Sequence, residues 1–346
     1  VYGPQGGAPL PIKIMDEELV VFRDDQGRPG LLDIHCCHRG SDISYGRVED
    51  GGLRCLYHGW LFDVNGKCLE QPAEPAGSTF KDKVNQKAYP CREAGKAIFA
   101  YLGPGEPPLL PNFQFLSAPP DQLVENRVFV DCNYLQANEG NIDPSHTSYV
   151  HRSVEHFEKD KDEEKAATEV LYHFQKHVCP DLEIEETHFG IRIYATRDQG
   201  DGTKHLRITN FVMPNYSAIG GPEVSQGFGR GGYTIIWHVP IDDYTNWRWT
   251  FTYHSQKGMD TEALYAAIND QKTPDHHHIR RMANRYLQDR DEMKTETFAG
   301  VGTSFAVHDA NVIETMGPIQ DRPAEHLGVT DIAIAAARRM LFQGIG

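Results

Sequence analysis

The first third of the chain alternates short apolar runs with clusters of turn-forming residues. The apolar runs "LVVFRD", "GLLDIHC", "LRCLYHGWLFD" and "AIFAYLG" are separated by "DDQGRPG", "EDGG" and "DVNGK". Runs of this length bounded by glycine, proline and aspartate are typical of β-strands. The next stretch, "YLGPGEPPLLPNF", is rich in proline and glycine, which is typical of a domain boundary. We therefore predict an all-β domain over residues 1–113.

The rest of the chain mixes helical and strand patterns. "NYLQANEGNIDPSHTSYVH" has a helical pattern that is interrupted at Pro144. Apolar and polar residues alternate over 184–194 and 247–253, which predicts a sheet with one buried face. Helices are predicted over 283–294 and 331–341, the second with Asp331 as its N-cap. Residues 114–346 are thus expected to form an α+β domain about twice the size of the first.

Composition narrows the class of protein. The net charge of −15 argues against nucleic-acid binding, which needs a basic face. No apolar run approaches the roughly 18–20 residues of a membrane helix, and the first residues do not resemble a secretory signal. Seven cysteines, an odd number, suit a reducing cytoplasm and metal chemistry better than disulfides. Because the chain does not begin with Met, we expect the native protein to start earlier, and we expect the charge run 155–169 to be a solvated segment.

Two mixed pairs of metal-binding side chains follow one another in the first domain. Sixteen residues separate the pairs, whose members are Cys36, His38, Cys55 and His58. Zinc in a tetrahedral site and a [2Fe–2S] cluster of the Rieske type both accept two Cys and two His. Zinc fingers usually pair Cys with Cys and His with His, whereas here each loop can give one ligand to each iron. The spacing favours the cluster, and we expect the glycines after each pair, Gly40 and Gly59, to donate N–H groups to its sulfurs.

A second group of candidate ligands lies in "NEGNIDPSHTSYVH". Asp143 and His146 are three residues apart and would share a helix face. His151 lies five residues beyond His146, so a distortion or a helix end is needed to bring both imidazoles to one metal. Two imidazoles and one carboxylate form the facial triad of non-haem Fe(II) oxygenases. We predict a mononuclear iron site here.

The two motifs in this order resemble the Rieske non-haem iron aromatic-ring oxygenases, in their catalytic α subunit. "HRG" and "YHGW" beside the first site carry the resemblance, and "GPIQDR" and "NRYLQDRDEMKTETFAGVG" are similar to the phthalate-dioxygenase branch. The family usually has proline where this chain has Cys37, and only Cys36 has the right offset to His38. The resemblance implies a Rieske β domain followed by a catalytic domain of the helix-grip, START-like kind, in which a curved antiparallel sheet wraps around a helix and a pocket.

The resemblance also implies roles for several carboxylates. It makes Asp309 in "HDANVIE" the third iron ligand, with Glu314 as the alternative. It gives Asp143 the role of a bridge from His146 to His58 of a neighbouring subunit, which implies a homotrimer that can stack into a hexamer.

Some neighbouring polar residues have no such role by resemblance. Asn138 and Glu139 either line the electron path or are structural. We expect Asp321 and the adjacent Arg322 to form a structural ion pair.

The implied activity is oxidation of an aromatic compound in aromatic catabolism. A separate NAD(P)H-dependent reductase, with or without a ferredoxin, would supply electrons for O₂-dependent hydroxylation of an aromatic acid such as a phthalate-like substrate. Oxidative O-demethylation or ether cleavage is an alternative, and an electron carrier or a zinc-stabilised binding module are alternatives of another class. No nucleotide fingerprint is present, because the glycine-rich segment 220–232 lacks the strand–turn–helix setting and is read as a loop.

The substrate contacts are not predicted. Arg192, Arg207 and Arg248 are candidate carboxylate anchors, but we expect them to face solvent. The segment His276–His278 is expected to be exposed and to bind no metal.

Overall fold

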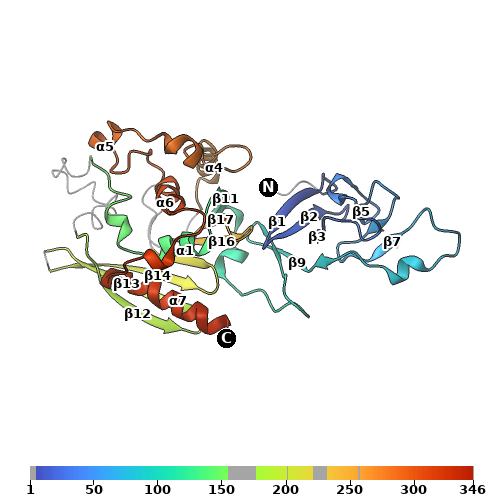
Figure 1. The fold of residues 1–346 in the computed structure, drawn as a ribbon, viewed down its shortest axis with the longest axis horizontal. Helices are drawn as coiled ribbons and strands as arrows, with labels where there is room; N and C mark the ends of the chain where they lie inside the picture. The colour runs from blue at the N-terminus through green and yellow to red at the C-terminus, as the bar shows by residue number, and fades with distance from the viewer. Residues whose placement is uncertain (1–4, 155–176, 201, 221–231, 256–257, 346) are drawn as a thin grey trace. The chain divides into compact units, whose positions relative to one another are not determined.

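A computed structural model describes residues 5–154, 177–200, 202–220, 232–255 and 258–345 (Figure 1). The chain divides into two compact units, Val1–Ser117 and Ala118–Gly346. The predicted solvated run 155–169 and nearly all of the glycine-rich segment 220–232 lie outside the described residues.

The first unit is built from short antiparallel strands, as the turn-rich sequence predicts. Its sheets have the strand orders β1-β2-β3-β8, β4-β5-β6-β7 and β10-β9. The strands are β1(Leu10–Ile14), β2(Glu17–Arg23), β3(Pro29–Asp33), β4(Arg47–Glu49), β5(Gly52–Arg54), β6(Leu61–Phe62), β7(Cys68–Glu70), β8(Ala88–Tyr89), β9(Cys91–Ala94) and β10(Ala97–Ala100). Val20, Leu32, Leu53 and Phe62 are fully buried between the sheets, together with the two predicted ligands Cys36 and Cys55. The all-β prediction for this part of the chain is confirmed.

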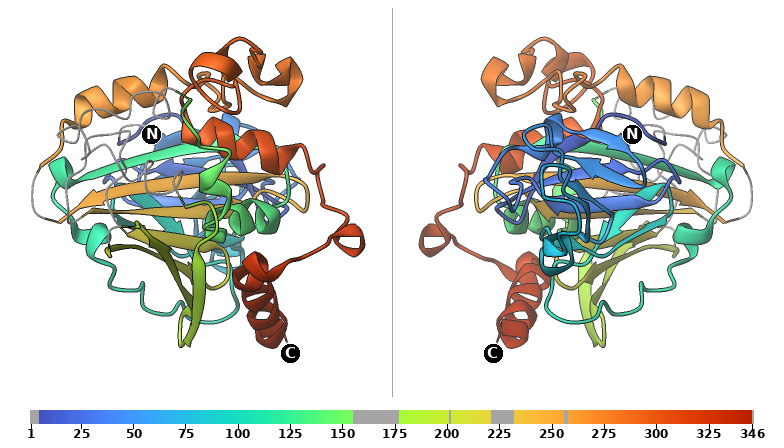
Figure 2. Two further views of the ribbon diagram at one scale, coloured as in Figure 1. Left: turned by 90° about the vertical axis from the view of Figure 1, so that its left-hand side faces the viewer. Right: turned by 90° about the vertical axis from the view of Figure 1, so that its right-hand side faces the viewer.

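The second unit contains a seven-stranded antiparallel sheet in the order β11-β17-β16-β15-β14-β13-β12. The strands are β11(Leu123–Val130), β12(Asp181–Thr187), β13(Gly190–Asp198), β14(Lys204–Val212), β15(Tyr216–Gly220), β16(Gly232–Pro240) and β17(Asn246–His254). The first strand of the unit pairs with the last, over Leu123↔Tyr253 to Val130↔Asn246. The predicted α+β domain with a curved antiparallel sheet is confirmed, and Figure 2 shows the sheet from its two ends.

The described helices of this unit are α1(Tyr134–Ile142), α4(Thr261–Asn269), α5(Glu292–Thr295), α6(Phe305–Glu314) and α7(Ile332–Ile345). Of these, α1, α4 and α7 pack against strands of the sheet. Ile142 of α1 and Ala333, Ala336 and Ala337 of α7 pack on buried strand residues such as Ile193. Helix α7 begins directly after Asp331, as predicted, and lies beside β12 and β13 in Figure 1.

The predicted helix over 283–294 is wrong. Met282–Leu287 forms a 3₁₀ segment that ends in three residues with positive φ, Arg285, Tyr286 and Leu287, and only Glu292–Thr295 is α-helical. Tyr286 is 2% exposed, and its hydroxyl donates to Glu314 and lies 3.1 Å from the carbonyl oxygen of Ala310. Burying this tyrosine at α6 requires the chain to turn inward, which a continuous helix would not allow.

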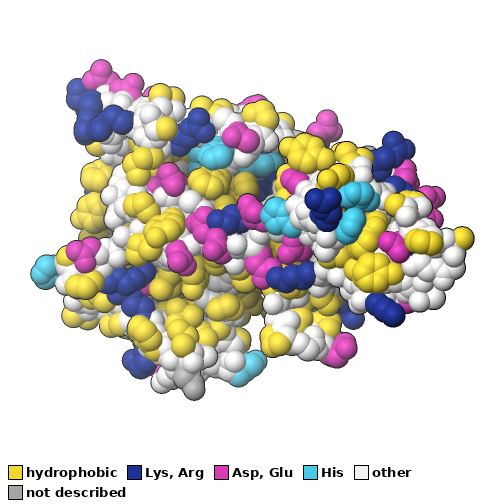
Figure 3. All heavy atoms as spheres, turned by 45° about the vertical axis from the view of Figure 1, so that its right-hand side comes forward, with side chains coloured by type: hydrophobic (Ala, Val, Ile, Leu, Met, Phe, Trp, Pro, Cys, Tyr) yellow, Lys and Arg dark blue, Asp and Glu magenta, His cyan; other side chains and the backbone are white. Residues whose placement is uncertain are grey.

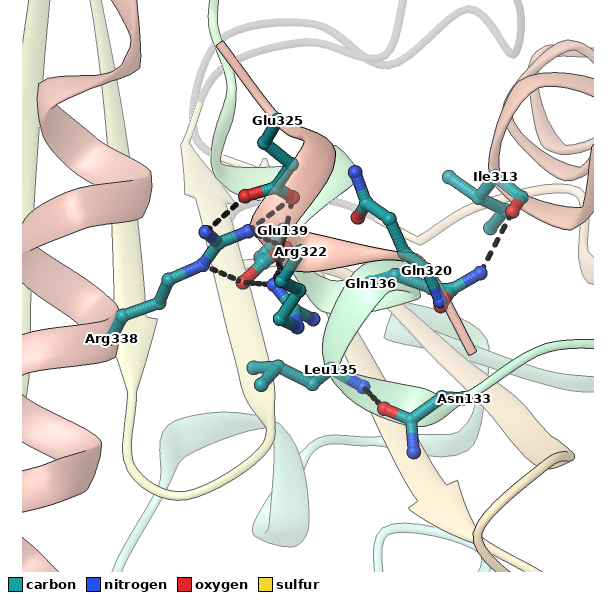
Figure 4. Close-up of polar contacts among 9 residues, drawn as sticks. All are labelled: Asn133, Leu135, Gln136, Glu139, Ile313, Gln320, Arg322, Glu325 and Arg338. Atoms are coloured by element: carbon teal, nitrogen blue, oxygen red, sulfur yellow. Dashed lines mark hydrogen bonds and ion pairs between the residues drawn. The ribbon is translucent and has the colours of Figure 1, made fainter. Parts of the chain in front are cut away.

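A buried ion cluster ties the C-terminal segment to α1 (Figure 4). Glu139 of α1 accepts from Arg338 Nε at 2.7 Å and Nη2 at 2.9 Å, and from Arg322 Nη1 at 2.9 Å. Arg338 also binds Glu325, with a shortest contact of 2.5 Å. Arg322 therefore pairs with glutamates and not, as predicted, with Asp321. The cluster gives Glu139 a structural role, because it fixes the helix that leads into the second predicted metal motif.

Charged side chains of both signs are mixed on the displayed face of the protein. Figure 3 shows acidic and basic side chains interspersed over the face that it displays. Among the described residues, we find no helix with both the length and the apolar character that crossing a membrane requires.

Candidate functional site

Two loops of the first unit bring the Cys and His pairs together. One loop follows β3 and carries Cys36 and His38, and the other follows β5 and carries Cys55 and His58. Both cysteines are buried, at 3% and 2% exposure. The two imidazole rings lie 4.5 Å apart between centroids, and Trp60 stacks on His38 at 4.3 Å.

Each loop is closed by the glycine that follows its ligands. The N–H of Gly40 donates to the carbonyl of Cys36 at 2.7 Å, and the N–H of Gly59 donates to the carbonyl of Cys55 at 3.1 Å. The prediction that these N–H groups point at sulfur is therefore wrong, since the turns use them internally. Both glycines have positive φ, +76° and +75°, which L-residues rarely adopt.

The cysteine between the first pair is separated from the buried pair. Cys37 is exposed, and its backbone N–H donates to Gln86 Oε1 at 2.7 Å. Burial, together with a smaller effect of the nearby Cys55 thiol, raises the pKa of Cys36 to about 12. Two adjacent buried thiols are costly to ionise unless a cationic group binds between them, so their chemistry fits an iron–sulfur cluster.

The second predicted site lies where helix α1 ends. The helix stops at Ile142, and a 3₁₀ turn over His146–Ser148 follows Pro144. This break supplies the distortion that the five-residue spacing to His151 demands. The sheet-facing helix α6 brings in Asp309, and one ligand atom from each of the three residues lies within 4.8 Å of the others.

The ligand atoms converge on one point. His146 Nε2 lies 3.2 Å from His151 Nε2, and Asp309 Oδ1 lies 3.7 Å and 3.1 Å from these two atoms. Burial lowers the pKa of both imidazoles. Burial alone would raise the pKa of Asp309, but His151, His146 and Arg248 outweigh burial and hold it below its usual value. Neutral imidazoles beside an ionised carboxylate are the donor set that ferrous iron takes.

Hydrogen bonds on the far side of each ring indicate the tautomers. His146 Nδ1 lies 2.5 Å from the carbonyl of Asp143, so this nitrogen carries the proton. His308 Nε2 lies 2.6 Å from the carbonyl of Gly302 and therefore donates, which leaves its Nδ1 to accept from His151 Nδ1 at 3.2 Å. The two Nε2 lone pairs then face one another, an arrangement that is repulsive unless a cation lies between them. The site thus fits a metal ion on its own geometry.

Asp143 shapes the turn that carries His146. Its carboxylate accepts from the N–H of Ser145 at 2.7 Å and of His146 at 3.2 Å, and it lies 3.8 Å from His146 Nδ1. The guanidinium of Arg197, 1% exposed, donates to the carbonyl of Pro144 at 2.8 Å. The turn is therefore held from both sides.

The two candidates for the third ligand lie in different surroundings. Asp309 faces the histidines, whereas Glu314 accepts from the backbone N–H of Asp131 at 3.0 Å and from the Tyr286 hydroxyl. Burial raises the pKa of Glu314. The structure brings only Asp309 of this pair to the two histidines.

A cavity of about 260 Å³ adjoins the metal site. It is bounded by β11, β17, α4 and the start of α6, where the ring of Phe305 stacks on His151 at 4.6 Å. Arg248 lines the cavity with an 11% exposed side chain, and its Nη2 lies 3.6 Å from Asp309 Oδ2. The expectation that Arg248 faces solvent is wrong, while Arg192 does lie at the surface in an ion pair with Glu185.

Sequence reasoning missed three residues that position the ligands. They are Gln86, Arg197 and His308. Gln86 holds the cluster loop, because its Nε2 also donates to the carbonyls of Asp33 and His35. Of the three, only His308 carries a signal in the sequence, its position directly before the predicted ligand Asp309.

Family models match nearly all of the chain. Residues 4–90 match a Rieske [2Fe–2S] domain, and residues 100–345 match a domain described as LigXa C-terminal domain like.

Curated relatives and solved structures agree. The phthalate 4,5-dioxygenase oxygenase subunit of Pseudomonas putida is 32% identical over 98% of this chain and 77% of its own length. The 5,5'-dehydrodivanillate O-demethylase oxygenase subunit of a Sphingobium species is 30% identical over 97% of this chain and 71% of its own length. The carbazole-bound oxygenase in the ferredoxin complex of carbazole 1,9a-dioxygenase shares the fold with a TM-score of 0.63 and 19% identity, covering 98% of this chain and 86% of that one.

Proposed function

The chain belongs to the Rieske non-haem iron oxygenases, and we propose that it is the terminal component that hydroxylates an aromatic acid. As a member of this family, it is an oxidoreductase with a [2Fe–2S] cluster and a mononuclear iron. We propose that the cluster domain spans residues 1–113 and the catalytic domain residues 114–346. The observation that carries the proposal is the convergence of three ligand atoms beside a cavity.

The proposed cluster ligands are Cys36, His38, Cys55 and His58, and the proposed iron ligands are His146, His151 and Asp309. Burial of the two thiols and the close approach of the two imidazoles support the first set. The facing Nε2 lone pairs support the second. Iron held by two imidazoles and one carboxylate keeps open positions at which O₂ can be activated. The chain's own part is to hold both imidazoles in the Nδ1–H tautomer and to place substrate in the adjoining cavity.

We propose that electrons come from a separate NAD(P)H-dependent reductase, directly or through a ferredoxin. We further propose a homotrimer, which can stack into a hexamer, in which Asp143 connects His146 to His58 of the neighbouring subunit. The partial exposure of the Asp143 side chain, 22%, supports this role, since a bridging carboxylate must be reachable from outside. A cytoplasmic location is proposed because none of the seven cysteines, all of them among the described residues, forms a disulfide, as is usual in a reducing compartment.

Two alternatives are kept. Oxidative O-demethylation or ether cleavage would use the same iron site, and the similarity to an O-demethylase subunit supports this alternative. A Rieske-type electron carrier would need no second metal, and the convergent triad beside a cavity speaks against it.

Metal analysis and oxygen uptake test the proposal together. We expect three irons per chain, a reduced-cluster electron paramagnetic signal and O₂ uptake that depends on an aromatic acid when a surrogate reductase is supplied. His146→Ala should lose one iron per chain and all oxygen uptake while it keeps the cluster signal. Two irons per chain in the wild type would indicate the carrier, and loss of the cluster signal in the variant would contradict the ligand assignment.

Asp143→Asn tests the bridge separately. We expect both metal sites to stay filled while turnover collapses, because the substitution removes the charge that connects two imidazoles but spares the ligands. Wild-type turnover in this variant would refute the bridge and leave the metal assignments intact.

A further inference from the structure

One end of the cavity carries two polar side chains that contribute no metal ligand. Lys272 and His278 both line it, and they face one another across an isolated antiparallel bridge. The turn between them is closed by the N–H of Thr273, which donates to the carbonyl of His277 at 2.8 Å. Residues directly opposite in an antiparallel pair point to the same side. The bridge therefore presents an ammonium and an imidazole to the cavity as a pair.

Lys272 lacks an anionic partner in the described part of the chain. Its Nζ donates to Asn126 Oδ1 at 2.6 Å, and no described carboxylate lies within ion-pair distance of it. None of the described residues that line the cavity is acidic. Burial, with Arg127 nearby, lowers the pKa of Lys272. A partly buried cation in this setting is stabilised by an anionic group on a ligand.

His278 is more deeply buried, with 5% exposure, so the expectation of solvent exposure is wrong for this histidine, whereas His276 and His277 are partly exposed. Neither ring nitrogen has a hydrogen-bond partner among the described residues. Burial lowers the pKa of His278 to about 4, so at neutral pH one nitrogen donates and the other accepts. Buried polar groups are nearly always partnered, which points to a ligand that completes this one.

We propose that Lys272 and His278 are the specificity-determining residues of the substrate cavity. Lys272 pairs with the carboxylate of an aromatic acid, and His278 hydrogen-bonds a hydroxyl or ether oxygen on the same ring. This inference rests on the proposed function and refines its substrate class. Apolar side chains of the walls, among them Val124, Leu264 and Ile268, contact the ring. Arg248 and Lys272 are the cationic side chains among the described residues that line the cavity. Because Arg248 lies 3.6 Å from Asp309, Lys272 is the better placed of these two to pair with a substrate carboxylate.

Equilibrium binding to the anaerobic holoenzyme tests the role of Lys272 without turnover. The probes are benzoate and its neutral isostere benzamide, titrated by calorimetry. We expect the wild type to bind benzoate at least tenfold more tightly, and Lys272→Met to weaken benzoate ~10–100-fold while benzamide is unchanged. Lys272→Arg should restore the preference. Lys294→Met, which removes a lysine with 71% exposure, is the matched control and should change neither affinity.

The three hydroxybenzoate isomers test His278. We expect at least one isomer to bind more tightly than benzoate to the wild type, and His278→Leu to abolish that gain while benzoate stays within about threefold. Equal benzoate and benzamide affinities in the wild type, or an unchanged ratio in Lys272→Met with both metal sites filled, would overturn the inference. A charge-dependent preference in a protein that shows no acid-dependent O₂ uptake would support the subsite and refute the proposed reaction.

Discussion

Replacing Arg338 with methionine should destabilise the catalytic domain far more than the same change at the adjacent Arg339. Arg338 makes bidentate contacts with Glu139 and with Glu325, and the three side chains are 17%, 7% and 11% exposed. Arg339 pairs with Glu186 at 2.6 Å, but these side chains are 58% and 56% exposed. The two substitutions remove the same chemical group from one helix and differ mainly in the burial of its partners.

The structure sets the magnitudes. Removing one partner of a buried ion pair costs ~3–5 kcal/mol because a desolvated charge is left behind. Glu139 keeps Arg322 at 2.9 Å, so the lower end, ~3 kcal/mol, is expected for Arg338→Met. An exposed pair contributes at most ~1 kcal/mol. For a domain of this size these values correspond to a fall in melting temperature of ~6–12 °C for Arg338→Met and below ~4 °C for Arg339→Met.

Thermal scans of the two holo variants at one scan rate measure the difference. Iron content is determined beforehand, so that both samples carry the same cofactors. The double variant Glu139→Gln/Arg338→Met should lose less than the sum of the single losses, since both changes break the same interaction. Equal shifts in melting temperature for Arg338→Met and Arg339→Met, or additive losses in the double variant, would contradict the idea that the ion cluster around Glu139 links α1 to α7.

Three further outcomes follow from the structure. Cys37→Ala should keep the visible spectrum of the cluster and Cys36→Ala should lose it, as absorbance after purification will show; loss in both would contradict the ligand choice. Arg197→Met frees the carbonyl of Pro144 and should weaken mononuclear iron binding ~10–100-fold with the cluster intact, which chelator titration measures. Burial lowers the pKa of His238 to about 3, so between about pH 6.5 and 3 the unfolded chain binds more protons than the folded chain and the free energy of unfolding falls with falling pH. In urea unfolding, His238→Gln should reduce the slope of this free energy against pH over that range. An unchanged slope would show that His238 does not cause the pH dependence.

Local spacing in the sequence predicts part of both proposed metal sites. The two Cys and His pairs lie within single turns, so the loop geometry around each pair is set by a few residues. Likewise, the break at Pro144 brings His146 and His151 together over a short stretch of chain. Asp309 lies more than 150 residues further along, where no spacing rule applies, and it was reached only through the family resemblance. Its position depends on how α6 packs against α1 and the sheet.

The wrong predictions for Arg248 and His278 share a physical cause. Arg248, Thr250 and Thr252 alternate along β17, and a polar face on a strand is typical of solvent exposure. In the structure this face lines the cavity, so its polar side chains point inward and not into solvent. The same reasoning applies to His278, which lies in a charged stretch of sequence but is buried. Patterning therefore separates core from surface, but it cannot distinguish the surface from an internal polar site.

Helix α6 links the parts of the metal site that the sequence keeps apart. It supplies Asp309, and the preceding residue, His308, accepts from His151 and so fixes which nitrogen of that ring is available. A displacement of α6 would therefore move the proposed carboxylate ligand and change the tautomer of a proposed histidine ligand at the same time. The helix is fixed at its other end by Glu314, which binds the backbone of Asp131 and the hydroxyl of Tyr286. Glu314, the candidate ligand that lies away from the histidines, thus influences the same site, because it fixes the helix that carries Asp309.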